Sequence, residues 1–241
     1  MRTLYIVATP IGNLADISPR AITVLSNVDV VLAEDTRVTR TLLEHYNLKK
    51  ELLVYHQHSD RKAIDRVIEM LRRGEDIALV TDAGTPGIND PGNFLISEVL
   101  KDFPEAHIVP VPGANAAISA LSISGFPSDS FTFMGFPPHK KGRQTFFNNI
   151  EATTHTVVLY ESKHRIVKAL TQLVPLGRPL VVCRELTKQF ETTYRGTAEE
   201  ILPQMTDKNL LGEFVIVVGP KPRKRNIIEE DATDEFETDE E

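Results

Sequence analysis

The sequence predicts an α/β protein in two parts, an N-terminal domain over residues 1–115 and a C-terminal domain over residues 116–220. In the first part short apolar runs alternate with helical patterns, an order typical of a mostly parallel, doubly wound sheet. The run at 77–80 is apolar throughout, as expected for a strand covered on both faces. Around residue 113 the pattern changes, which favours a separate, mixed α/β domain and a boundary near 113–120.

The expected N-terminal elements follow in chain order. Strands are expected at 4–8, 28–33, 52–55, 77–80 and 106–111. Ser18 and Pro19 mark the start of a helix that reaches about residue 27, because Ser is a good N-cap and proline suits the first helical position. Further helices are expected at 36–46, from Asp60 to about Gly74, and after Pro91.

The C-terminal part begins with a small-residue helix expected at 114–124. Residues 131–136 alternate in the manner of an antiparallel strand. Other strands are expected at 156–160, 180–184, 191–194 and 214–218, with helices at 162–172 and 197–206. Residues 221–241 are first basic and then acidic, and we expect this tail to be disordered.

Composition limits the class of protein. The net charge of −7 misleads, because residues 229–241 hold nine acidic and no basic side chains, so the rest has 27 basic against 25 acidic groups. A nearly neutral body permits a nucleic-acid partner without requiring one. No run of 18 apolar residues suggests a membrane span, and the N-terminus resembles a strand rather than a signal peptide. A single cysteine, Cys183, favours a reducing, cytoplasmic location.

Three turns are predicted to meet at one edge of the first sheet. They are Thr9-Pro-Ile-Gly-Asn13, Asp82-Ala-Gly-Thr-Pro-Gly87 and Val111-Pro-Gly-Ala-Asn115, and each follows a predicted strand. Ligands of open α/β sheets bind beyond the carboxyl ends of the strands, where small residues let the backbone approach. Neither a P-loop nor a G-x-G-x-x-G motif is present, so the turns predict a backbone-lined pocket for a small molecule that is not held by those phosphate cradles.

Five strings together resemble the tetrapyrrole-methylase superfamily. They are Ala8-Thr-Pro-Ile-Gly-Asn-Leu14, Ala33-Glu-Asp-Thr-Arg37, Thr81-Asp-Ala-Gly-Thr-Pro86, Val111-Pro-Gly-Ala114 and Gly212-Glu-Phe-Val215. The resemblance covers about residues 1–219 and is greatest to the branch that methylates a cytidine ribose 2′-hydroxyl in small-subunit (16S) ribosomal RNA. Tetrapyrrole enzymes more often have Gly-Asp-Pro where this chain has Gly84-Thr-Pro86, and this departure favours the RNA branch.

The resemblance implies two α/β domains with S-adenosylmethionine in the cleft between them, and it implies a homodimer. It also implies small-subunit ribosomal RNA or the 30S subunit as the partner. The cofactor contacts that follow from the motifs and the three turns are Pro10, Asp82, Ala83, Gly84, Thr85, Pro86, Gly113 and Ala114. Leu186, Gly212 and the neighbourhood of Glu161 are added from the second domain.

Methylation of a ribose hydroxyl calls for positioning and for a base that takes the hydroxyl proton. Glu34 and Asp35 are the first candidates, because they follow the second strand on the same edge as Asp82. Glu185 is the other candidate. Lys188 is expected to assist deprotonation or, like Arg37, to hold a phosphate. The Glu34-Asp35 pair has an alternative interpretation as a charge pair at the N-terminus of the next helix.

Three basic clusters are candidates for RNA contacts, since cationic loops beside a cleft suit phosphates. Their members are Lys140, Lys141 and Arg143; Lys163 and Arg165; and Arg184 and Arg195 together with Lys188. Phe133, Phe136 and Tyr160 are candidates to stack an unpaired base. For all of these, solvated surface or core packing is the alternative interpretation.

Two other functions stay open at this point. One is methylation of a tetrapyrrole, which needs cations aimed into the cleft, and the other is a non-catalytic RNA-binding or ligand-binding module. His56 and His58 lie on one face of a strand without an evident third ligand, so no metal site is expected.

Overall fold

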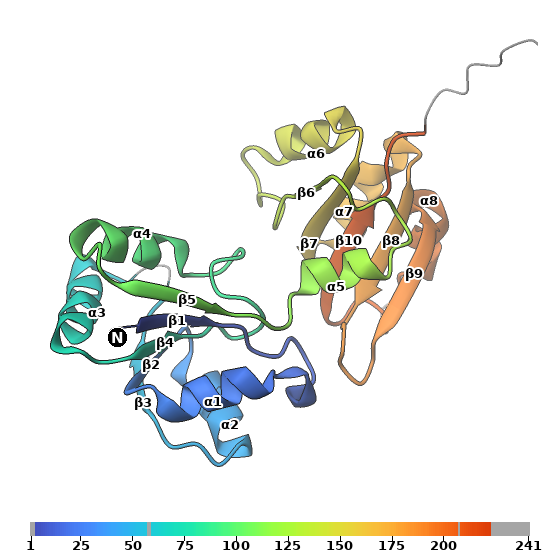
Figure 1. The fold of residues 1–241 in the computed structure, drawn as a ribbon. Coiled ribbons are helices and arrows are strands. Elements are labelled where there is room, and N and C mark those ends of the chain that lie inside the picture. Colours follow the sequence, from blue (N-terminus) through green and yellow to red (C-terminus); the bar gives the residue numbers. More distant parts are fainter. Residues whose placement is uncertain (1–2, 57–58, 207, 223–241) are drawn as a thin grey trace, which may run out of the picture.

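The computed structural model describes residues 3–56, 59–206 and 208–222. His58 and nearly all of the predicted tail lie outside these residues. The described chain forms two five-stranded sheets with separate helical layers, and Figure 1 shows them as two halves joined side by side. No helix among these residues is long and apolar enough to cross a membrane.

The N-terminal half is a parallel sheet with strand order β3-β2-β4-β1-β5. Its strands are β1 (Thr3–Val7), β2 (Val30–Ala33), β3 (Glu51–Val54), β4 (Ile77–Leu79) and β5 (His107–Val111). Its helices are α1 (Pro19–Asn27), α2 (Thr36–His45), α3 (Arg61–Arg73) and α4 (Asn93–Asp102), with a 3₁₀ turn η1 at Leu14–Asp16.

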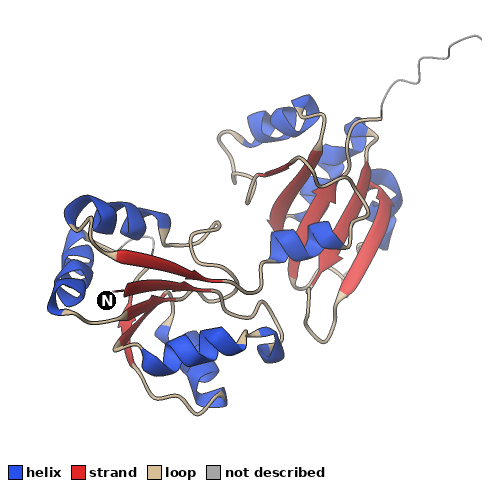
Figure 2. Ribbon diagram, viewed as in Figure 1, coloured by secondary structure: helices blue, strands red, loops and turns tan. Residues whose placement is uncertain are grey.

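Helices cover both faces of this sheet, as a doubly wound fold requires (Figure 2). On one face α3 and α4 pack against the strands through residues such as Ile64 and Val99. On the other face α1 and α2 do so through residues such as Leu25 and Leu42. The predicted doubly wound architecture is therefore confirmed, and the strand of residues 77–79 is buried at every position.

Local signals place several helix ends as predicted. The Ser18 hydroxyl accepts a hydrogen bond from the Ala21 amide, and Pro19 occupies the first turn of α1. The Asp60 carboxylate caps α3 at the Ala63 amide. Gly74 ends α3 with φ of 98°, a left-handed conformation that costs glycine little. The helix predicted after Pro91 begins at Asn93.

The C-terminal half is a mixed sheet with strand order β6-β7-β10-β8-β9. Its strands are β6 (Phe131–Phe133), β7 (Thr156–Ser162), β8 (Pro179–Arg184), β9 (Thr192–Thr197) and β10 (Glu213–Val218). Its helices are α5 (Ala116–Ser122), α6 (Arg143–Ala152), α7 (Ile166–Leu173) and α8 (Ala198–Ile201), with 3₁₀ turns η2 (Val174–Leu176) and η3 (Leu202–Gln204). The chain crosses from the first sheet to the second between β5 and α5, where the domain boundary is predicted.

One predicted pairing in this half is wrong, and two predicted helices have other bounds or a tighter form. Residues 131–133 pair with β7 in parallel rather than antiparallel, because the unpredicted helix α6 connects the two strands as a crossover. The helix expected at 162–172 begins only at Ile166, and the one expected at 197–206 is a single short turn that tightens into a 3₁₀ turn after Ile201.

The second sheet also has a core on each face. α6, α7 and α8 cover one face, with Phe146, Ile150 and Ile166 among the buried residues. α5 covers the other face, and this cluster also contains Ile11 from the N-terminal half and the buried Cys183. The apolar contact through Ile11 therefore connects the first sheet's edge to the second sheet.

Candidate functional site

The three glycine- and proline-containing turns meet at the carboxyl edge of the first sheet, as predicted. The Thr9 amide donates to the Gly84 carbonyl at 2.9 Å, and the Gly84 amide donates back to Thr9 at 3.1 Å. The Thr85 hydroxyl donates to the Ala114 carbonyl at 3.0 Å. Each turn is therefore hydrogen-bonded to another, and the three form one rigid rim.

Close backbone approach explains the glycines in this rim. Gly84 has φ of 90°, and a Cβ there would lie 3.3 Å from Ile11 Cγ2. A Cβ on Gly113 would lie 2.9 Å from the Cβ of Ala8, closer than real Cβ atoms approach. Larger residues would force the turns apart, so these positions keep the rim compact.

A cavity of about 650 Å³ lies against this rim, between the edges of the two sheets. A volume of this size suits a ligand of a few tens of atoms. The lining residues that were predicted as site residues are Glu34, Asp82, Ala83, Gly84, Thr85, Lys163, Glu185, Leu186, Lys188 and Gly212. Pro10, Pro86, Gly113 and Ala114 were predicted to contact the cofactor but are not among the lining residues.

Carboxylates gather on the N-terminal wall of the cavity. The Thr81 hydroxyl, which is buried, donates to Glu34 Oε2 at 2.8 Å. Asp82 Oδ1 accepts the Asp35 amide at 3.1 Å. Burial raises the pKa of the Asp82 carboxyl, against the opposing effect of that amide, and the charges of Glu34 and Asp35 raise it further. This wall therefore suits a cationic ligand group.

Asp35 itself caps a helix, which agrees with the alternative interpretation of the acidic pair. Its Oδ1 accepts the Arg37 amide at 2.8 Å, and its carboxylate forms an ion pair with the Arg37 guanidinium. The Arg37 side-chain hydrogen bond lowers the pKa of Asp35 to about 2. A carboxylate of such low basicity is a poor proton acceptor near neutral pH, so Asp35 is the weaker member of the pair as a base.

Asp90 lines the same cavity and was missed at the sequence level. Burial raises its pKa to about 6, helped by the charges of Glu34 and Asp82 and opposed by a hydrogen bond with Thr81. Asp90 lies in Ile88-Asn-Asp-Pro91, directly after the glycine loop. The sequence around it offers one local signal, an acidic side chain before Pro91 close to the glycine loop, whereas its environment depends on Glu34 and Thr81 from other segments.

The C-terminal wall contains an ion-pair cluster. Lys188 Nζ lies 3.0 Å from Glu185 Oε1 and 2.9 Å from Glu213 Oε2. Burial alone would raise the pKa of Glu185, but the Glu213 amide and Lys188 lower it overall. Burial lowers the pKa of Lys188, but its two carboxylate partners raise it overall. Glu185 and Lys188 therefore stabilise each other as a charged pair.

The loop that carries this cluster has strained backbone. Glu185 and Thr187 have φ of 53° and 65°, a region that non-glycine residues seldom adopt. Gly212 lies against it with φ of 113°, and a Cβ there would lie 2.5 Å from Glu185 Cγ. Strain of this kind persists where the surroundings hold a loop in place, and here it shapes one wall of the cavity.

Two predicted RNA contacts are buried and have internal partners. The Arg143 guanidinium donates to Gln172 at 2.7 Å and lies 3.5 Å from the buried carboxylate of Glu161. Arg184 donates to the carbonyls of Leu211 and Phe190 at 2.6 and 3.1 Å. Both arginines hold the C-terminal half together, because their donors face the interior, and we remove them from the candidate RNA surface.

Arg165 and Arg195 are less buried than Arg143 and Arg184, but their guanidinium groups also have partners within the protein. Arg165 Nε lies 3.0 Å from Glu161 Oε1 and its Nη1 donates to the Pro137 carbonyl at 2.9 Å. Arg195 is exposed, and its guanidinium donates to the Ile123 and Ser124 carbonyls that follow α5. Both guanidinium groups are therefore already engaged by carboxylate or carbonyl oxygens of the C-terminal half.

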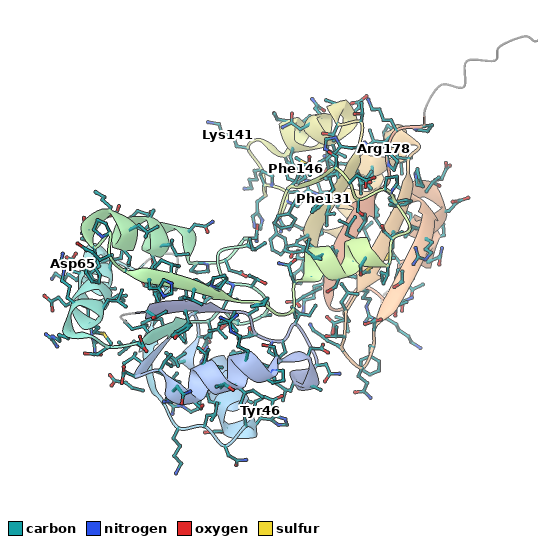
Figure 3. The ribbon with its side chains drawn as sticks, viewed as in Figure 1. Tyr46, Asp65, Phe131, Lys141, Phe146 and Arg178 are labelled. Carbon is teal, nitrogen blue, oxygen red and sulfur yellow. The ribbon has the colours of Figure 1, made fainter. Side chains whose placement is uncertain are left out.

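Lys140, Lys141 and Lys163 are exposed, and of these three Lys163 lines the cavity. Lys140 and Lys141 lie in the loop before α6, and Figure 3 shows Lys141 projecting away from that helix. Lys163 lines the cavity where β7 ends and is exposed. Their exposure is compatible with phosphate contacts, which stay a prediction.

An aromatic group forms part of the C-terminal wall. The rings of Phe136 and Tyr160 lie 5.5 Å apart, and those of Phe133 and Tyr160 lie 5.0 Å apart. Phe136 and Tyr160 line the cavity, and Phe136 is 46% exposed. The Tyr160 hydroxyl accepts the Ala117 amide at 3.2 Å. The exposed face of Phe136 is therefore free to take an aromatic ligand group.

Residues 3–202 match the family described as tetrapyrrole (corrin/porphyrin) methylases. Proteins named ribosomal RNA small subunit methyltransferase I are similar over most of the chain. The relative from Xylella fastidiosa is 46% identical over 90% of this chain and 81% of its own length. The relative from Halalkalibacterium halodurans is 43% identical over 90% and 75%, and that from Escherichia coli O157:H7 is 43% identical over 93% and 80%.

Solved structures share the fold. A uroporphyrin-III C-methyltransferase from Thermus thermophilus superposes with a TM-score of 0.61 at 22% identity, over 91% of this chain and 94% of its own. A diphthine synthase superposes with a TM-score of 0.65 at 11% identity, over 90% of this chain and 89% of its own. At this level of identity the likeness concerns the two-half architecture and not the substrate.

Proposed function

Because the chain belongs to the tetrapyrrole (corrin/porphyrin) methylase family, we propose that it transfers a methyl group from S-adenosylmethionine to a cytidine ribose 2′-hydroxyl in small-subunit ribosomal RNA. The observation that carries the proposal is the similarity, over most of the chain, to proteins named small-subunit ribosomal RNA methyltransferases. A tetrapyrrole substrate is supported by the family's description and by solved structures that share the fold at 22% identity or less, but not by the names of these more similar relatives. We also propose a cytoplasmic homodimer, as the family resemblance implies.

The residues present fit the cofactor. The cavity has the size of a drug-like ligand site, and the rim of Ala83, Gly84 and Thr85 offers backbone groups without bulky side chains. The carboxylates of Glu34 and Asp82 complement the positive charges of a sulfonium and an ammonium group. Ile11 and Leu186 supply apolar contacts from the two halves.

The bound cofactor supplies an activated methyl group, and the chain's own residues provide the positioning. The hydrogen-bonded rim fixes one wall, and the Glu185–Lys188 pair fixes the other. Holding the reacting groups in line in this way lowers the activation barrier by several kcal/mol. Lys140, Lys141 and Lys163 hold RNA phosphates beside the cavity, and Phe136 offers a ring for stacking a base.

Transfer of labelled methyl groups tests the function directly. The purified protein is incubated with methyl-labelled S-adenosylmethionine and 30S subunits from cells that lack this modification, with naked 16S RNA and a uroporphyrinogen in parallel. We expect label in the RNA, recovered as 2′-O-methylcytidine after nuclease digestion. Label only in the tetrapyrrole, or in the base rather than the ribose, would contradict the proposal.

Replacing Lys140 and Lys141 together with alanine is expected to weaken RNA binding and to flatten its salt dependence. Each lost phosphate contact should reduce the slope of log K against log salt by up to about 1. Titration of labelled RNA at several salt concentrations measures this, and cofactor affinity should not change. The matched control is Lys49→Ala/Lys62→Ala, because both lysines are exposed on the N-terminal half and neither lines the cavity. Equal RNA binding by the two double variants would remove the loop from the RNA surface.

A further inference from the structure

The carboxylates around the cavity differ in whether they are free to take a proton. Asp35 is paired with Arg37, and Glu185 with Lys188. Asp82 accepts a backbone amide. Glu161 lies between Arg143 and Arg165. The ion pairs of Asp35 and Glu185 help to lower the pKa of these two carboxyl groups, so both are poorly suited to accept a proton.

Glu34 and Asp90 differ from the other four because they share one hydroxyl. Thr81 is a buried residue that lines the cavity, and its hydroxyl donates to Glu34 at 2.8 Å. The same hydroxyl interacts with the Asp90 carboxylate. A threonine hydroxyl has a single hydrogen but two lone pairs. That hydrogen can be given to only one of the two carboxylates at a time, so Asp90 loses a contact that lowers its pKa whenever the hydrogen is given to Glu34.

The position of Asp90 also suits a reacting group. It lies on the loop after the glycine rim, and its charge acts on Tyr160 across the cavity. Asp90 therefore faces the space between the two halves, beside the rim that is proposed to hold the cofactor. A substrate hydroxyl that enters this space comes close to Asp90.

We propose that Asp90 is the catalytic residue that accepts the proton of the ribose 2′-hydroxyl, with Thr81 as a positioning residue that links it to Glu34. The inference rests on the proposed function. In the step, the oxygen of the hydroxyl forms a bond to the methyl carbon, and the carbon–sulfur bond breaks with its electron pair going to sulfur. The oxygen–hydrogen bond breaks, and the proton goes to the Asp90 carboxylate.

Asp90→Asn keeps the shape of the side chain and removes the proton acceptor. We expect the single-turnover rate of RNA methylation at saturating cofactor to fall by about 10²–10⁴-fold. The dissociation constant for S-adenosylmethionine, measured by calorimetry, should be unchanged. Asp129→Asn is the matched control, because Asp129 is exposed on the loop before β6 and does not line the cavity. Loss of cofactor binding by Asp90→Asn would overturn the inference and make Asp90 a cofactor ligand.

The pH dependence supplies a test that needs no variant. Protonated Asp90 accepts no further proton, so the wild-type rate should fall as pH drops below about 6. The groups that act on Asp90 are Glu34, Asp82 and Tyr160, and Lys163 and His164 line the same cavity. Because an ordinary histidine titrates in the same range, the acidic limb must persist in His164→Gln and vanish in Asp90→Asn. A flat wild-type profile would overturn the inference.

Two further measurements separate the possible failures. In the free protein, one aspartate carboxyl should titrate near pH 6 by ¹³C NMR and be absent from Asp90→Asn. Thr81→Val should lower the turnover rate without raising the KM for RNA and should move this titration. An undiminished rate in Asp90→Asn overturns the inference alone, whereas absence of RNA methylation by the wild type overturns the proposed function and the inference with it.

Discussion

Replacing Arg178 with alanine is expected to lower the free energy of unfolding by at least about 3 kcal/mol. Arg178 is buried in the C-terminal half (Figure 3), where its guanidinium donates to four carbonyls. The acceptors are Gly219 at 2.6 Å, Ile150 and Thr153 at 2.9 Å, and His155 at 2.8 Å. The side chain thus joins the end of α6 to the end of β10, and alanine would leave these carbonyls without their donor.

Urea unfolding measures this effect. Arg178→Lys should recover only part of the loss, because an ammonium group lacks the planar fork that reaches several carbonyls at once. Arg20→Ala is the control, since Arg20 is exposed on α1 and its removal should change stability by about 0.5 kcal/mol or less. Equal midpoints for Arg178→Ala and Arg20→Ala would show that water replaces the guanidinium without cost.

The sequence was sufficient to predict the N-terminal half and the meeting of its three turns. Continuous apolar strands and good caps such as Ser18 and Asp60 are local signals, and each forms the predicted structure. The turns at Thr9 and Gly84 meet because parallel strands bring their carboxyl ends to one edge. This rule can be applied to a sequence as soon as the order of its strands and helices is known.

Helix α6 illustrates why the C-terminal half was harder to predict. Gly142, at its N-cap position, makes no side-chain capping bond, and the preceding loop is rich in proline and charge. Without a helix between them, two strands suggest a hairpin. With α6 present, the connection becomes a crossover and the pairing of β6 with β7 becomes parallel.

Side-chain roles that depend on distant partners could not be predicted from local patterns. Arg143 and Arg184 were predicted to be surface cations, because their hydrogen-bond acceptors, such as Gln172 and Leu211, come from segments distant in the sequence. The environment of Asp90 likewise requires Glu34, which is far away along the chain. A sequence motif is enough to locate the glycine rim of the cavity, whereas the protonation of a carboxylate depends on the assembled fold.

Gly12 lies where the two halves come into close contact, with no room for a side chain. A Cβ on Gly12 would lie 2.4 Å from Lys188 Cγ, 2.8 Å from Thr187 Oγ1 and 2.9 Å from the Leu186 carbonyl. The neighbouring Ile11 lines the cavity from one side, and Leu186 and Lys188 line it from the other. Lys188 is held by its two carboxylates, so the loop has little freedom to yield. Any side chain at position 12 must therefore separate the two walls of the cavity.

Gly12→Ala is expected to weaken S-adenosylmethionine binding by about 10–100-fold, which corresponds to an overpacking cost of about 1–3 kcal/mol. The free protein can relieve the clash by opening slightly, so its thermal stability should change little. The bound form needs both walls in contact with the ligand, and it bears the cost. Calorimetry measures the affinity, and a melting curve of the free protein measures the stability.

Gly177→Ala is the control, because it should change stability and leave cofactor affinity unchanged, the reverse of what we expect for Gly12→Ala. Gly177 has φ of 57°, and among the described residues no neighbouring atom lies within 4 Å of the place that a Cβ would take. Alanine there costs about 1–2 kcal/mol of backbone strain without a clash. We expect this variant to lose stability and to keep its cofactor affinity.

A different outcome for Gly12→Ala would change the description of the site. If this variant bound the cofactor as tightly as the wild type, the contact between Gly12 and the loop at 186–188 would have to open during binding. The cofactor would then be held by the N-terminal rim alone, and Leu186 and Gly212 would no longer count among its contacts.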